Sequence, residues 1–68
     1  MTIENVLELM TFTPMTRVKI NCYREGYLST VADSGWKGIK DIPLEITMRD
    51  VTSIAVCDNT IVLEYNDD

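Results

Sequence analysis

The side chains able to act as nucleophiles, general bases or metal ligands are few in this sequence, and their spacing forms no catalytic pattern. The 68 residues include no histidine, which removes the commonest general base and the commonest metal ligand. Cys22 and Cys57 have no adjacent base that would generate a thiolate. We expect both to be reduced core or near-core residues, and a single disulfide between them is the alternative. No Asp-x-Asp-x-Asp-Gly run indicates a calcium loop, so the sequence predicts no enzyme, metal site or cofactor.

Acidic residues dominate the C-terminal part of the chain and define one candidate binding surface. The net charge is −5, and residues 50–68 contain five acids and no base. Such asymmetry is typical of solvated faces and soluble tails. It would also suit a protein that presents carboxylates where a nuclease expects phosphates. The acidic residues that we expect to bind a partner are Asp50, Asp58, Glu64, Asp67 and Asp68.

Basic and aromatic residues in the middle of the chain define the alternative, a surface that binds nucleic acid. All six Lys and Arg residues lie between positions 17 and 49. Basic side chains interleaved with aromatic ones on a sheet can bind a single strand, because bases stack on the rings and phosphates pair with the cations. The net negative charge weakens this attraction. The residues of this alternative site are Arg17, Lys19, Tyr23, Tyr27, Trp36 and Lys37.

The segment Gly35-Trp36-Lys37-Gly38 is a G-x-x-G motif with a basic insert. In KH domains such a loop clamps the backbone of four nucleotides, but there it joins two helices. Here an expected strand precedes it, so we interpret the segment as a loop anchored by its aromatic side chain.

A short amphipathic helix is expected over residues 3–10. The apolar residues Ile3, Val6, Leu7 and Met10 have the i, i+3, i+4, i+7 spacing of one helix face. Thr2 can accept a hydrogen bond from the backbone amides of the first turn. Residues 11–14 end in proline and are expected to stop the helix.

Two β-hairpins are expected after this helix. Residues 17–23 alternate apolar and polar side chains, the turn Arg24-Glu25-Gly26 supplies a glycine for positive φ, and residues 27–33 return as the second strand. Residues 51–65 alternate around Asp58-Asn59, a pair that tolerates positive φ. Between the hairpins, residues 43–49 have a proline suited to a first helical turn but also a strand-like alternation. We favour a one-turn helix there and leave the strand open.

These elements predict a single α+β domain over residues 1–68. An N-terminal amphipathic helix would pack on a four-stranded, mostly antiparallel β-meander, with a short helical turn before the last hairpin. The last strand, residues 60–65, has no proline or bulge to guard it as a sheet edge, and so short a chain has a thin core, so we expect a homodimer. The expected core residues are Ile3, Val6, Leu7, Met10, Val18, Ile20, Leu28, Ile54, Val56, Ile61 and Leu63.

The N-terminal segment indicates where the protein is located. It contains Glu4 and Glu8 and no basic leader, which is unlike a signal peptide. No run approaches the ~20 apolar residues of a membrane span. We therefore expect a cytoplasmic protein with no membrane partner.

The succession TIENVLEL, TRVKI, YLST, DIPLEI, RDVTSI and IVLEY, with its segment from Pro43-x-Glu45 to Val51, resembles a group of short, acidic, mostly uncharacterised proteins. Phages and mobile elements of Firmicutes encode them. The resemblance covers most of the chain and includes no catalytic signature, so no functional residue is carried over.

Some small acidic proteins of such elements inhibit host defence, including CRISPR–Cas nucleases. The resemblance therefore implies a non-enzymatic interaction protein that binds a host or phage macromolecule through its sheet face or acidic C-terminal side, with anti-CRISPR-like inhibition of a defence nuclease as one form. A single-stranded nucleic-acid-binding protein is the alternative.

Overall fold

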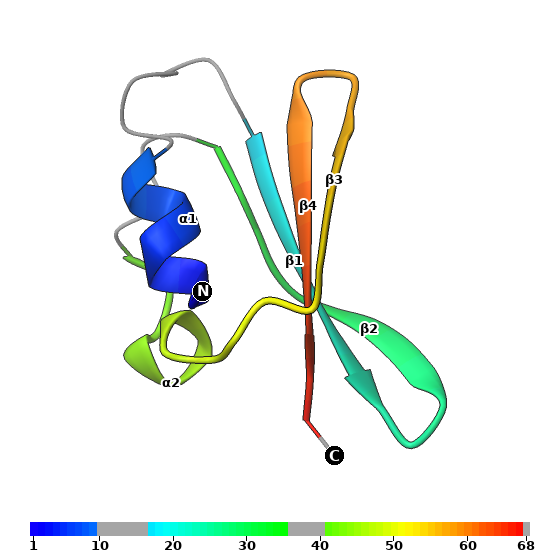
Figure 1. Cartoon of the computed structure of the whole chain (residues 1–68). Helices are drawn as coiled ribbons and strands as arrows, with labels where there is room; N and C mark the ends of the chain where they lie inside the picture. The colour runs from blue at the N-terminus through cyan, green and yellow to red at the C-terminus, as the bar shows by residue number, and fades with distance from the viewer. Residues whose placement is uncertain (10–16, 36–40, 68) are drawn as a thin grey trace.

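Two short helices lie on one side of a four-stranded sheet in the computed structural model, which describes residues 1–9, 17–35 and 41–67 (Figure 1). The elements follow one another as α1 (Ile3–Leu9), β1 (Arg17–Arg24), β2 (Tyr27–Ser34), α2 (Leu44–Thr47), β3 (Ser53–Cys57) and β4 (Thr60–Asn66). The predicted helix, two hairpins and intervening helical turn are therefore all present, and the α+β class is confirmed.

The sheet is mixed, with the strand order β2-β1-β4-β3. Both hairpins are antiparallel, but β1 and β4 pair in parallel, beginning with Arg17 beside Thr60. The hairpin turns consequently lie at opposite ends of the sheet (Figure 1). The predicted meander is wrong in this respect, because a meander would place β2 beside β3. The chain instead crosses through α2 after β2 and reaches the far edge, which leaves the place beside β1 for β4.

This order also corrects the expected sheet edge. The last strand, β4, lies between β1 and β3, and the edges are β2 and β3. The physical reason is the distribution of apolar side chains. Val18 and Ile20 of β1 and Leu63 of β4 are fully buried, whereas every residue of β3 is exposed. In the middle of the sheet, β1 and β4 bury these side chains in the core cluster with Ile3, Val6 and Leu7 of α1.

Helix α1 begins at a reciprocal cap. The Thr2 hydroxyl accepts from the Asn5 backbone N–H at 3.2 Å, and the Asn5 side-chain oxygen accepts from the Thr2 backbone N–H at 3.0 Å. These bonds satisfy amides that a helix start leaves without partners. The segment before the helix is tied to residues 49–51 as well, since Val51 donates its N–H to the Met1 carbonyl at 2.8 Å. The predicted cap at Thr2 is confirmed.

Both hairpin turns use positive φ at their two central residues. Asp58 and Asn59 have φ of 49° and 63°, and Glu25 and Gly26 have φ of 50° and 84°. Two-residue turns of this kind match the right-handed twist of the strands that they join. The turn predictions are therefore confirmed.

Helix α2 answers whether residues 43–49 form a helical turn or a strand. The Met48 backbone N–H donates to the Leu44 carbonyl at 3.0 Å, which is a helical and not a strand bond. Ile46 packs against the core, while Leu44 and Met48, one turn apart, are exposed. The one-turn helix that we favoured is the observed structure.

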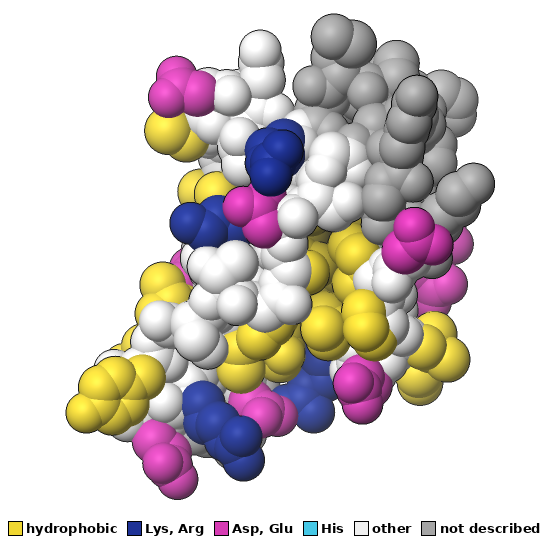
Figure 2. All heavy atoms as spheres, turned by 180° about the vertical axis from the view of Figure 1, so that it is seen from behind, with side chains coloured by type: hydrophobic (Ala, Val, Ile, Leu, Met, Phe, Trp, Pro, Cys, Tyr) yellow, Lys and Arg dark blue, Asp and Glu magenta, His cyan; other side chains and the backbone are white. Residues whose placement is uncertain are grey.

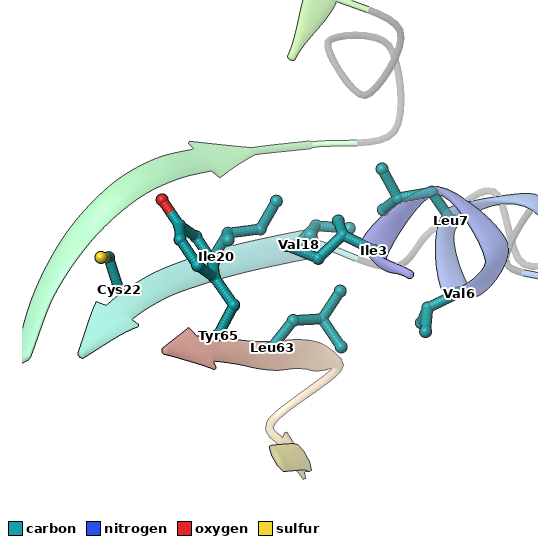
Figure 3. Packing of buried hydrophobic residues seen from close by; sticks show 8 residues of the cluster. All are labelled: Ile3, Val6, Leu7, Val18, Ile20, Cys22, Leu63 and Tyr65. Atoms are coloured by element: carbon teal, nitrogen blue, oxygen red, sulfur yellow. The ribbon is translucent and has the colours of Figure 1, made fainter. Parts of the chain in front are cut away.

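The core gathers side chains from α1 and the two central strands (Figure 3). Helix α1 has only seven residues, which is about 10 Å of length. It therefore covers the middle of the sheet and not its edges. The buried apolar residues are Ile3, Val6, Leu7, Val18, Ile20, Cys22, Leu63 and Tyr65.

Three predicted core residues are exposed instead. Ile54 and Val56 lie on the core face of the edge strand β3, which no described helix covers, whereas Leu28 lies opposite Tyr23 on the face of β2 that points away from the core. Ile61 is half-buried against the core, and Met10 lies outside the described residues. Alternation identified the core-facing side chains of β3, but it could not show that the short helix would leave this strand uncovered.

Candidate functional site

A groove of about 320 Å³ opens beside the C-terminal end of β4. Arg49 is its central charged group. The guanidinium lies 5.3 Å from the centre of the Tyr65 ring and forms an ion pair with the Asp67 carboxylate. The residues that line the groove are Val31, Glu45, Ile46, Arg49, Tyr65 and Asp67.

Asp67 joins three parts of the chain in this groove. Its carboxylate is shared by Arg49 and by Arg24, whose Nε lies 3.8 Å from Oδ2. Its backbone N–H donates to the Tyr23 carbonyl at 3.0 Å. The Asp67 carboxylate neutralises the positive charge of Arg49. We call these contacts of Asp67 with Arg49, Arg24 and Tyr23 the clasp, because they hold the C-terminal residues against the β1–β2 hairpin.

Tyr65 contacts the Arg49 guanidinium through its ring, and its hydroxyl stays protonated. Burial raises the pKa of the Tyr65 hydroxyl, and so do a hydrogen bond with the Cys22 side chain, the charge of Cys22 and the charge of Asp67, while Arg49 opposes them. Figure 3 shows Tyr65 and Cys22 side by side on neighbouring strands. A tyrosine with a raised pKa stays neutral near pH 7 and is no general base there.

The described residues assemble no other reactive constellation. Within residues 1–9, 17–35 and 41–67, no three Cys, Asp or Glu side chains converge as metal ligands would. Cys57 is an exposed free thiol beside the Asp58 carboxylate at 3.8 Å, and Cys22 is a buried free thiol. The two cysteines do not form a disulfide in this structure.

The structure separates the four described acidic residues of the predicted partner site. Asp58 occupies the β3–β4 turn and Asp67 follows the other end of β4, so about 30 Å of extended chain lies between them. Asp50 is exposed near the N-terminal amine, and Glu64 projects from the sheet face opposite the core. Asp68 lies outside the described residues. Asp50, Asp58, Glu64 and Asp67 therefore form no single patch.

The basic and aromatic residues of the alternative site are brought together only in part. Arg17, Lys19 and Tyr23 share the face of β1 that points away from the core. Arg17 is paired with Asp33 at 2.7 Å, which neutralises one of the cations. Tyr27 lies opposite Arg24, on the other face of the hairpin from Tyr23. Trp36 and Lys37 lie outside the described residues.

The sequence placed Tyr23 and Tyr27 in the alternative site but missed that Leu28, which was expected in the core, joins them in an exposed apolar tip of the β1–β2 hairpin. Tyr23 and Leu28 are direct cross-strand partners, and Tyr27 lies beside the turn. Figure 2 shows hydrophobic side chains at this projecting end of the molecule, with acidic and basic side chains next to them. The signal in the sequence was weak, because Ser29 and Thr30 leave β2 without a clear apolar face. We name Tyr23, Arg24, Tyr27, Leu28 and Asp67 the hairpin-tip surface, in which Tyr23 and Leu28 lie on one face of the hairpin and Arg24 and Tyr27 on the other.

No protein-family model, curated protein or solved structure matches this chain. Among the described residues, neither helix has the length or the apolar character needed to cross a membrane.

Proposed function

We propose that the protein is a non-enzymatic, cytoplasmic interaction protein of a phage or mobile element, and that it binds a protein partner through the hairpin-tip surface. The observation that carries this proposal is the exposure of the apolar tip. Tyr27 is 79% exposed, Leu28 52% and Tyr23 44%. Large apolar side chains gathered at one projecting end of a small acidic protein are typical of an interaction site.

The composition of the hairpin-tip surface supports a protein partner over a nucleic acid. Tyrosine and arginine are enriched among the residues that carry most of the energy of protein interfaces. The clasp adds a carboxylate, because Asp67 is held against Tyr23 and Arg24. The surface therefore combines the sheet face and the acidic C-terminal side that the sequence indicated separately.

A specific form of this proposal is inhibition of a host defence nuclease. Carboxylates would then stand where the nuclease expects phosphates. Charge reversal of the predicted acidic set tests this form, with circular dichroism to verify folding. If every partner interaction survives the reversal of Asp50, Asp58, Glu64, Asp67 and Asp68, the mimicry is excluded.

The experiment for the proposed function is affinity capture from a host lysate divided into nuclease-treated and untreated halves. We expect a protein partner that survives nuclease and is lost with the double variant Tyr27→Ala, Leu28→Ala. The matched control is Leu44→Ala, which truncates an equally exposed apolar side chain on α2. Capture that disappears with nuclease would instead support the nucleic-acid alternative. Capture that the double variant leaves unchanged would contradict the hairpin-tip surface.

We also propose that the protein acts as a homodimer. Its 68 residues form a core of only eight buried apolar side chains in the described part of the chain. A second copy would cover apolar surface that one copy leaves in water.

A further inference from the structure

Strand β3 presents an open row of hydrogen-bonding groups at one edge of the sheet. Within the described residues it pairs with β4 alone. The two-residue turn makes Cys57 and Thr60 a hydrogen-bonded pair, and such pairs alternate along an antiparallel ladder. The backbone groups of Ala55 therefore point toward β4, and those of Ile54 and Val56 point outward.

The side chains of β3 do nothing to protect this edge. The strand sequence SIAVC contains no charge and no proline, and its register with β4 is regular. Val56 is 72% exposed and Ile54 52%. These two side chains lie on the same face as the core, beside Ile61 and Leu63. An apolar and regular edge of this kind is a template for another strand.

The opposite edge of the sheet, β2, has features that prevent pairing with another strand, so β3 is the edge that is available for pairing. Strand β2 carries an irregularity in its register, where Val31 has no partner between the pairs Ile20–Ala32 and Asn21–Thr30. It also carries Asp33, which is bonded to Arg17. Bulges and charges are the devices by which proteins prevent edge-to-edge pairing.

We infer that β3 pairs antiparallel with β3 of a second copy, about a two-fold axis at Ala55. In this register Ile54 of each copy lies opposite Val56 of the other, and each of these two pairs exchanges both backbone hydrogen bonds. Ser53 lies opposite Cys57, so no like charges face each other along the strand. The same segment, β3, forms both sides of this interface, as a two-fold interface requires.

The occupant is a second copy because the edge is complementary to itself in both hydrogen bonding and side chains. The contact is made by two strands of five residues each, so we expect a weak association, with a dissociation constant on the order of micromolar. Each copy has a net charge of −5, and the interface itself is uncharged. Added salt should therefore strengthen the association by screening the repulsion between the copies. The inference specifies the interface of the homodimer proposed above and does not depend on the hairpin-tip partner.

Cysteine cross-linking tests the register directly, in a Cys57→Ser background that removes the exposed thiol. The Cα atoms of Ala55 in the two copies should lie about 4.5 Å apart, within reach of a disulfide. The matched control is Ser53→Cys, on the same strand and face, where the two copies of the residue are separated by at least about 13 Å. We expect Ala55→Cys to give a disulfide dimer under mild oxidation and Ser53→Cys to give little. Equal yields from the two variants would overturn the proposed register.

Sedimentation measurements test the dimer itself. We expect wild type to be dimeric and Val56→Lys to be a folded monomer, with circular dichroism to verify folding. Val31→Lys on the β2 edge is the control and should remain dimeric. The inference would be overturned if wild type is monomeric at every accessible concentration. It would also be overturned if Val31→Lys abolishes the dimer and Val56→Lys does not. If Val56→Lys is monomeric but still captures the lysate partner, the dimer and the hairpin-tip function are separate properties.

Discussion

Arg49, Tyr65 and Asp67 show how single side chains hold the end of the chain in place. Arg49 lies over the Tyr65 ring and is paired with Asp67, while Arg24 approaches the same carboxylate from the hairpin. All of these ion pairs are partly exposed, so each contributes modestly to stability. Their joint effect is positional, because they keep the C-terminal acid beside the apolar hairpin tip. The groove around Arg49 thus joins the end of the chain to the β1–β2 hairpin.

The raised pKa of Tyr65 predicts a pH dependence of stability. Its folded-state pKa lies above the unfolded value, because burial and the neighbouring Cys22 disfavour the phenolate. The resulting contribution to stability is complete below the unfolded pKa and is lost as the pH rises from there through the folded pKa. We expect Tyr65→Phe to reduce the alkaline loss of unfolding free energy, at a cost of less than about 1 kcal/mol near neutral pH. Urea denaturation of both proteins from neutral to alkaline pH measures this difference, and parallel curves would contradict it.

The two hairpin turns set the pairing of each strand with its neighbour. Asp58-Asn59 and Glu25-Gly26 have positive φ throughout, so each turn fixes the register of its own hairpin. The β1–β2 turn is what brings Tyr23 opposite Leu28 at the tip. The β3–β4 turn decides which residues of β3 bond outward. The residues of the two turns therefore determine which residues form the hairpin-tip surface and which residues of the β3 edge can pair with a second copy.

Replacement of Asn59 tests the contribution of the second turn. Asn59 has φ of 63°, a conformation that β-branched residues rarely adopt. We expect Asn59→Val to lower the free energy of unfolding by about 1–2 kcal/mol. The control is Asn59→Gly, which should cost nothing because glycine adopts positive φ without strain. Chemical denaturation distinguishes the two, and similar losses for both variants would show that the side chain matters for another reason.

The whole molecule has a small core and a large exposed apolar surface. A seven-residue helix cannot cover four strands, so Ile54 and Val56 of β3 remain exposed in a single copy, and Leu28 is exposed on the face of β2 away from the core. This imbalance supports both proposals, since one edge would be covered by a second copy and the hairpin tip by a partner. A dimer that buries part of this surface would make stability depend on association.

Coupled folding and association predicts that thermal stability depends on protein concentration. Where the dimer is populated, a tenfold dilution should lower the Tm of wild type by up to about 5 °C, given the unfolding entropy of a chain of this size. The Tm of Val56→Lys should not change with dilution. Differential scanning calorimetry at several concentrations measures both. Concentration-independent unfolding of wild type would be evidence against a dimer.

The sequence by itself determined the features that depend on neighbouring residues. The cap at Thr2, the helical turn after Pro43 and the positive-φ pair Asp58-Asn59 were all predicted and observed. Each is encoded within a few residues, by a side chain that satisfies a local amide or tolerates a local backbone conformation. The alternation of β1 and β4 likewise identified Val18, Ile20 and Leu63 as buried.

Only the tertiary structure decided which strands became neighbours, and with them the location of the candidate sites. The parallel pairing of β1 with β4 buried Tyr65 and left Leu28, Ile54 and Val56 exposed on the edges. It also joined Asp67 to the hairpin tip and separated it from Asp58. Strand order depends on how the whole chain best buries its apolar surface with a helix too short to cover the sheet. That choice is a global balance, so no local pattern of residues could reveal it.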